Sequence, residues 1–206
     1  GSKGLAAINL VFPIIMIVFA VSDMIAAGAS VKIGIKLGEK KEEEASNIFS
    51  IALLLMFIVD SIFMILSLVF AKDIIFILIK DKELATLSYR FAYVFILALP
   101  IIAPFFALDN YLRLCGKANM SMWINIAVSI LNIILDAILI GYFKLGIEYA
   151  ALCSALSMFI GTLIFLYPFI MKKVTLRFTK PKVDVKEILY IIYNGSSEFL
   201  SNISNS

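Results

Sequence analysis

The sequence predicts an all-α polytopic membrane protein, and its composition and hydropathy pattern carry that prediction. Of its 206 residues, 62% are hydrophobic and only 16% are charged, whereas soluble domains contain roughly 45–50% apolar and about 25% charged residues. The apolar residues also form continuous runs, and a helix needs about 20 of them to cross a membrane. Runs of this kind exclude a transmembrane β-barrel, whose strands are short and alternate in polarity.

Five apolar runs are long enough to span a membrane. They cover about 5–31, 45–71, 91–112, 118–143 and 147–171. A shorter run near 74–79 cannot span and is predicted to be an interfacial segment. The polar, basic stretch 176–187 is predicted to be a cytoplasmic linker. It divides the chain into a first bundle, over 1–175, and the start of a second, over 188–206.

The connections between the spans predict the orientation of the chain. Those after the first, third and fifth spans carry 12 Lys and Arg residues, and the opposite side carries 6. The positive-inside rule therefore places the first set in the cytoplasm and the start of the chain outside. Because the chain opens and closes within helix-like sequence, we expect a fragment of a longer protein. A cytoplasmic start would require one more helix ahead of Gly1.

The rest of the composition excludes several classes of function. There is no His, and the two Cys residues cannot form a disulfide scaffold. A net charge of +3 is too small to indicate nucleic-acid binding. We therefore predict that the chain is not an enzyme, requires no cofactor and does not bind nucleic acid.

One polar face stands out within the fourth span. Asn125, Ser129, Asn132 and Asp136 are spaced four, three and four residues apart, which places them on one side of a helix. An ionised Asp in the middle of a membrane costs about 2.5–3.5 kcal/mol. The face therefore predicts a hydrated or ion-binding stripe, since such oxygens bind Na⁺ and a carboxylate can carry a proton. Interhelical hydrogen bonding is the alternative, and it suits Asn125 and Ser129 best.

Three other acidic residues lie within or near spans. Asp23 sits in a run of small residues, where a polar-cavity role and a capping role are both open. Asp60 lies deep in the second span, and the sequence indicates no partner for it. Asp109 precedes Arg113 by four residues, which predicts an ion pair along one helix.

Six segments carry recognisable motifs along the chain: GLAAINLVFPI (4–14), GASVKIGIKLGEKKEEEA (28–45), DNYLRLCGKANMSM (109–122), NIILDAILI (132–140), LGIEYAALCSALS (145–157) and NGSSEFLSNIS (194–204). In their order and spacing they resemble one family, the multidrug and toxic compound extrusion (MATE) transporters. The Asn-x-x-x-Asp pair of NIILDAILI, followed by the small residues of LGIEYAALCSALS, is the most specific part. The resemblance covers essentially the whole chain.

The resemblance implies a fold of twelve helices in two pseudo-symmetric bundles of six. This chain would hold helices two to six and the first turns of helix seven, which is half of such a transporter. The family exchanges Na⁺ or H⁺ for organic cations across the cytoplasmic membrane, in prokaryotes among others. The implied partners are membrane lipid, the organic cation and the missing remainder of the transporter chain.

The resemblance also implies a cation site. In prokaryotic members the site uses an Asp in helix one, an Asn and an Asp in helix five, and a Thr in helix six. Asn132 and Asp136 match the helix-five pair, and Ser154 falls where the Thr is expected. The helix-one Asp is not in this chain. Ser129, Asn125 and Asp23 are candidates for a polar cavity beside the site, and no metal other than Na⁺ is implied.

Two alternatives to a cation-coupled exporter remain open. A lipid-linked saccharide flippase of the same superfamily would need Arg or Lys within its spans to bind pyrophosphate, and this sequence has none there. A non-transporting membrane scaffold would have no need of the Asn132–Asp136 pair.

Overall fold

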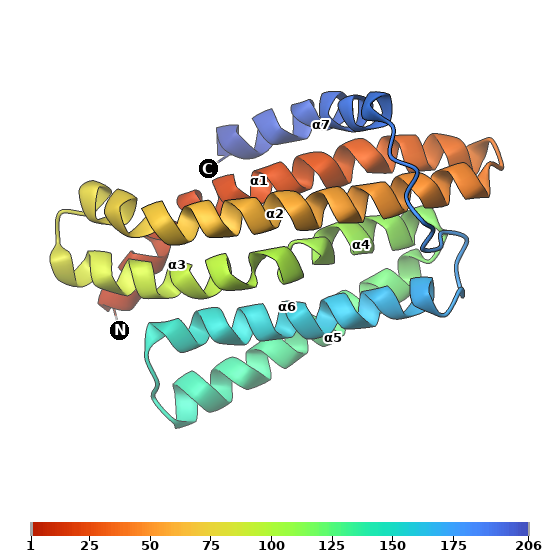
Figure 1. Ribbon diagram of the computed structural model, residues 1–206. Helices are drawn as coiled ribbons and strands as arrows, with labels where there is room; N and C mark the ends of the chain where they lie inside the picture. The colour runs from red at the N-terminus through yellow and green to blue at the C-terminus, as the bar shows by residue number, and fades with distance from the viewer. Residues whose placement is uncertain (1, 206) are drawn as a thin grey trace.

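The computed structural model describes residues 2–205, which form a bundle of long helices (Figure 1). The elements are α1 (Ser2–Gly38), α2 (Glu42–Leu78), α3 (Lys82–Ile102), α4 (Pro104–Leu114), α5 (Ala118–Asp136), the π-helix η1 (Ala137–Tyr142), α6 (Ile147–Ile170) and α7 (Val185–Asn205). Within 2–205 there is no strand, and five stretches are long and apolar enough to cross a membrane. The predicted all-α polytopic class is confirmed.

Helices α1 and α2 are longer than a membrane requires. Each has 37 residues, or roughly 55 Å at 1.5 Å per residue, against a hydrocarbon core of about 30 Å. The apolar segment near 74–79, expected as a separate interfacial piece, is the continuation of α2 as far as Leu78. No Gly or Pro lies between 45 and 78, so nothing breaks the helix until Ile79 turns to extended backbone.

The third span consists of two helices. Asp81 begins α3 by accepting hydrogen bonds from the backbone N–H groups of Glu83 and Leu84, at 2.9 and 3.1 Å. The helix ends ahead of Ala103, and α4 begins at Pro104. Proline lacks an N–H and favours the first position of a helix, so it marks the break.

The basic connections lie together at one end of the bundle. The α1–α2 turn, the α4–α5 turn and the segment between α6 and α7 are all at the right in Figure 1, and the other two connections are at the left. This is the alternation that successive crossings require. The assignment of the right-hand end to the cytoplasm stays a prediction from the positive-inside rule.

The buried core contains aromatic contacts between helices. The ring of Phe49 stacks on Phe169 with centroids 4.9 Å apart and meets Tyr111 edge-on at 5.6 Å. These contacts join α2 to α6 and α4. On the outside, large apolar side chains such as Val69 and Ile77 are more than half exposed, which suits a surface that faces lipid.

The segment between α6 and α7 is fastened to α2. Three of its backbone N–H groups donate to polar side chains in the first turns of α2, at 2.8–3.2 Å: Arg177 to Ser46, Thr179 to Ser50 and Lys182 to Asn47. Val174 and Leu176, which belong to the same segment, are buried. The predicted linker therefore follows a fixed path, and α7 begins at Val185 rather than at 188.

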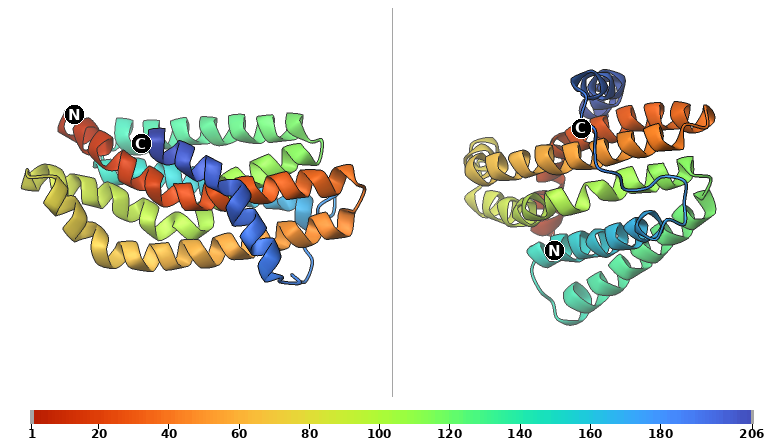
Figure 2. Two further views of the ribbon diagram at one scale, coloured as in Figure 1. Left: turned by 90° about the horizontal axis from the view of Figure 1, so that it is seen from above. Right: turned by 45° about the vertical axis from the view of Figure 1, so that its right-hand side comes forward.

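Helix α7 crosses α1 at very close range. The left panel of Figure 2 shows α7 lying diagonally over α1. A β-carbon at Gly28 would overlap the backbone carbonyl of Ile191, and one at Gly195 would overlap the carbonyl of Met24. Two glycines thus allow the two backbones to touch. Closer to the basic end, Lys32 and Glu187 add an ion pair of 3.0 Å.

We expect Gly28→Ala to push α7 away from α1. The added methyl group meets backbone rather than a flexible side chain, so the cost should be about 1–3 kcal/mol, as for other overpacked sites. The measurement is the melting temperature of the purified protein, which should fall. Gly38→Ala is the matched control, because a β-carbon there meets nothing within 4 Å. Equal melting temperatures for the two variants would contradict the close crossing.

Candidate functional site

A groove between α4, α5 and α6 gathers most of the predicted polar face. Its volume is about 440 Å³. The polar side chains that line it are Asn125, Ser129 and Asn132 from α5 and Ser154 and Ser157 from α6. Phe105 and Phe106 of α4 form part of its wall. Asp136 lies one helical turn beyond Asn132, as the last residue of α5.

Asn132 and Ser154 are in direct contact. The Asn132 Nδ2 donates to the Ser154 Oγ at 3.3 Å, which ties α5 to α6. Both side chains are half-buried. The structure therefore brings together two of the three residues that the sequence assigns to the cation site.

The Asp136 carboxyl is the acidic group of this region, and one of its oxygens, Oδ1, is buried and lacks a hydrogen-bond partner among the described residues. The buried thiol of Cys153 interacts with the same carboxyl. An unpaired carboxylate oxygen is costly away from water, so a bound proton or cation would stabilise it.

Sequence reasoning missed two features around Asp136. The first is Cys153, whose thiol interacts with the Asp136 carboxyl. The available signal was its position next to Ser154. The second is the π-helix η1, which starts at Ala137, directly after Asp136. Such segments are rare and frequently occur at functional sites, and no residue pattern in the sequence marks this one.

Asn125 belongs to a structural network at the end of the groove. The Asp109 carboxylate accepts hydrogen bonds from Asn125 Nδ2, at 2.8 Å, and from the Ser121 hydroxyl. It also pairs with Arg113 at 3.0 Å, so the predicted ion pair along the helix is confirmed. Asn125 therefore holds α5 against α4. Ser129 is exposed in the same groove.

Asp23 lies in a second groove that meets the first. This groove, of about 570 Å³, runs between α1, α3, α4 and α6. Its polar lining consists of Asp23, Asn110 and Ser154, and its walls are largely aromatic and apolar. Because Ser154 lines both grooves, Asp23 shares an open space with the Asn132–Ser154 pair. No pattern in the sequence singles out Asn110, whose amide donates to Ser30 at 3.1 Å.

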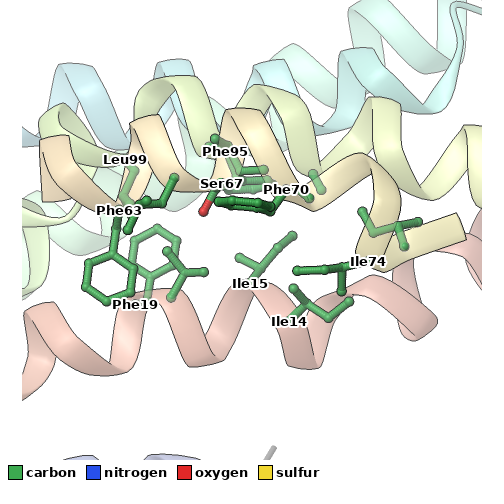
Figure 3. A pocket seen from close by; sticks show the side chains of 15 residues that line it. Ile14, Ile15, Phe19, Phe63, Ser67, Phe70, Ile74, Phe95 and Leu99 are labelled. Carbon is green, nitrogen blue, oxygen red and sulfur yellow. The ribbon is translucent and has the colours of Figure 1, made fainter. Parts of the chain in front are cut away.

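A third groove, shown in Figure 3, is almost wholly apolar. It lies between α1, α2 and α3, has a volume of about 250 Å³, and has Ser67 as its polar lining residue. Ile15, Phe19 and Phe95 separate it from the groove that contains Asp23. Its lining suits hydrocarbon and offers no charge to a cation.

A helical bundle that spans the membrane several times and has polar grooves between its helices is typical of membrane transporters. The family model named MatE matches residues 1–138. The chain belongs to this family, the multidrug and toxic compound extrusion transporters, so the resemblance found in the sequence is confirmed. The relatives in this family are transporters rather than enzymes, and the prediction of a multi-pass protein of the cytoplasmic membrane is confirmed.

Two curated relatives are bacterial multidrug proteins. The chain is 30% identical over 207 residues to the multidrug export protein MepA of Staphylococcus aureus, covering 98% of this chain and 45% of the relative. It is 26% identical over 203 residues to the probable multidrug resistance protein YoeA of Bacillus subtilis, covering 93% and 43%. The chain thus spans about half the length of the curated relatives it matches.

Solved MATE structures share the fold. An outward-facing MATE family transporter matches with a TM-score of 0.92 and 27% identity, over 99% of this chain and 46% of that one. An inward-facing structure matches with a TM-score of 0.91 and 27% identity, over 99% and 47%. The helix arrangement described here therefore corresponds to half of a MATE transporter and fits both facing directions.

We expect Asp109→Ala to destabilise the contact between α4 and α5. The change removes the acceptor that Ser121 and Asn125 share across the two helices and the ion-pair partner of Arg113, and leaves Asn125 with its bond to the Ser121 carbonyl of its own helix. The expected cost is about 1–3 kcal/mol. Thermal unfolding of the purified protein should show a lower melting temperature. Thr86→Ala serves as the control, since its hydroxyl bonds only the Lys82 carbonyl of its own helix, at 2.8 Å. A melting temperature unchanged in Asp109→Ala would show that the network contributes little.

Proposed function

We propose that this chain supplies the ion-coupling half of an antiporter that exports organic cations or drugs in exchange for Na⁺ or H⁺. The observation that carries the proposal is the buried, unpartnered Oδ1 of Asp136, one turn from the Asn132–Ser154 contact. The multidrug names of the relatives support the substrate class. The direction of exchange follows from the family.

Asp136, Asn132 and Ser154 offer three kinds of oxygen to a cation. A carboxylate, an amide carbonyl and a hydroxyl are hard ligands of the type that Na⁺ prefers. A proton would need Asp136 alone. In either case the bound ion neutralises Asp136 and lowers the cost of keeping this face of α5 away from water. Ion binding would thereby shift the population between inward- and outward-facing states.

The groove that contains Asp23 is the proposed entry to the substrate site. Aromatic rings from α1, α3 and α4 line it together with one carboxylate. Aromatic faces and a carboxylate attract an organic cation, and apolar walls accept the rest of a drug molecule. Transporter sites of this kind lie near the middle of the membrane, between the two halves of the protein.

The two rivals predict different contents for these grooves. A flippase for lipid-linked saccharides would need Lys or Arg to bind pyrophosphate, and neither residue is among the described lining of the two polar grooves. A scaffold would transport nothing. Transport of a fluorescent organic cation in proteoliposomes separates the proposed antiporter from both rivals, because neither of them would move the cation.

We expect Asp136→Asn to abolish ion-driven efflux while leaving membrane insertion intact. The amide keeps the size of the side chain but can neither carry a proton nor supply a negative charge. The measurement is the uptake of a fluorescent cation by proteoliposomes that contain the whole transporter. A Na⁺ gradient at constant pH and a pH gradient without Na⁺ are imposed in turn.

Ser154→Thr is the matched control, because it retains the hydroxyl and should retain transport. Ser154→Ala should weaken transport driven by Na⁺ more than transport driven by H⁺, since it removes one oxygen ligand. Transport by Asp136→Asn at the wild-type rate under both gradients would overturn the proposal.

A further inference from the structure

Asp60 is a buried acid outside the site described above. It is the midpoint of α2 (Glu42–Leu78), and only 1% of it is exposed. In a span of this length the midpoint lies deep in the hydrocarbon region. The described lining of the three grooves between the helices does not include it.

The contacts of Asp60 leave its charge uncompensated. Its Oδ1 accepts a hydrogen bond from the Ser22 hydroxyl of α1. Its Oδ2 is buried without a partner among the described residues. No Lys or Arg occurs in the sequence between 4 and 31 of α1 or between 45 and 71 of α2. The carboxyl is thus held by one hydroxyl in a seam that contains no cation.

The helices packed against α2 bring no basic group to Asp60 either. Among the described titratable side chains, the one whose charge acts on Asp60 is Asp23 of α1. The charged residues of α3 lie in its outer part, at 82, 83 and 90. Those of α4 are Asp109 and Arg113, which pair with each other. Among the described residues, the charged group that acts on Asp60 therefore has the same sign.

A proton fits this site and a metal ion does not. Sodium needs several oxygen ligands, and among the described residues the hydrogen-bond partner of the Asp60 carboxyl is the single hydroxyl of Ser22. A proton on Oδ2 needs no extra space. A carboxyl buried without a counter-charge becomes neutral rather than remaining ionised.

We propose that Asp60 is a proton-binding site in the α1–α2 seam, separate from the site at Asp136. The proton is on Oδ2, and Oδ1 accepts from Ser22. Exchange with water passes through Asp23, which follows Ser22 in the chain and lines the groove of about 570 Å³. Proton release leaves a carboxylate that must draw in water or separate α1 from α2. Because α7 packs on α1, a shift of α1 relative to α2 on proton release would also change the crossing of α7 over α1.

The test is infrared difference spectroscopy of the intact protein in lipid nanodiscs. The band followed over pH is the C=O stretch of protonated carboxyl groups. We expect a component of this band at neutral pH that is lost in Asp60→Asn and retained in Asp136→Asn, and a protonated Asp136 would contribute a separate component that only Asp136→Asn removes. A band that Asp60→Asn leaves unchanged, or the absence of any such band, would overturn the proposal. Neither outcome depends on transport, so this test is independent of the proposed antiport.

Ser22→Ala provides a second readout that keeps Asp60 in place. Removing the hydroxyl takes a hydrogen bond from the carboxyl oxygen, so the band should move to higher frequency. Ser61→Ala is the matched control, because Ser61 adjoins Asp60 but donates to the Phe57 carbonyl of its own helix, at 2.6 Å. A band that stays in place in Ser22→Ala, or that moves equally in both variants, would contradict the proposed site even if Asp60→Asn fails to fold.

Discussion

Water is absent from the hydrocarbon core, so each polar side chain in a spanning helix must find its partner within the protein. This constraint organises the bundle, because the polar contacts between spans each tie one helix to another. Ser22 joins α1 to α2, Ser88 joins α3 to α1, Asn110 joins α4 to α1, Asn125 joins α5 to α4, and Asn132 joins α5 to α6. Apolar packing fills the space between these contacts, but it is less selective for register.

The basic end of the bundle is fixed by a different set of contacts. The segment after α6 lies against α2 through side-chain bonds to its backbone, and α7 then crosses α1 where Gly28 and Gly195 let the backbones meet. The chain fits outward- and inward-facing relatives almost equally well. The helices of this half can therefore keep one arrangement while its relation to the rest of a transporter changes.

Hydropathy and helical spacing sufficed to predict the class of fold and the pair of Asp109 with Arg113. These features depend on residues close together in the sequence or on composition. The partner of Asp60 could not be predicted, because Ser22 lies 38 positions away on another helix. The same holds for Cys153 beside Asp136. The continuation of α2 to Leu78, beyond the predicted span, could not be predicted. Hydropathy predicts which residues lie in the hydrocarbon region, but it does not predict where a helix ends.

The polar groups that the bundle leaves unsatisfied are as informative as those it pairs. Four buried side-chain atoms among the described residues lack a partner, on Asp60, Asp136, Ser157 and Glu187. Ser157 lines the groove between α4, α5 and α6, and Asp136 lies one turn of α5 beyond Asn132. Asp60 lies in the α1–α2 seam, and Glu187 pairs with Lys32 near the crossing of α7 over α1. A static bundle would be more stable with each atom paired or replaced by an apolar group. We propose that these are the positions at which a proton, an ion or a neighbouring helix is exchanged when a whole transporter changes state.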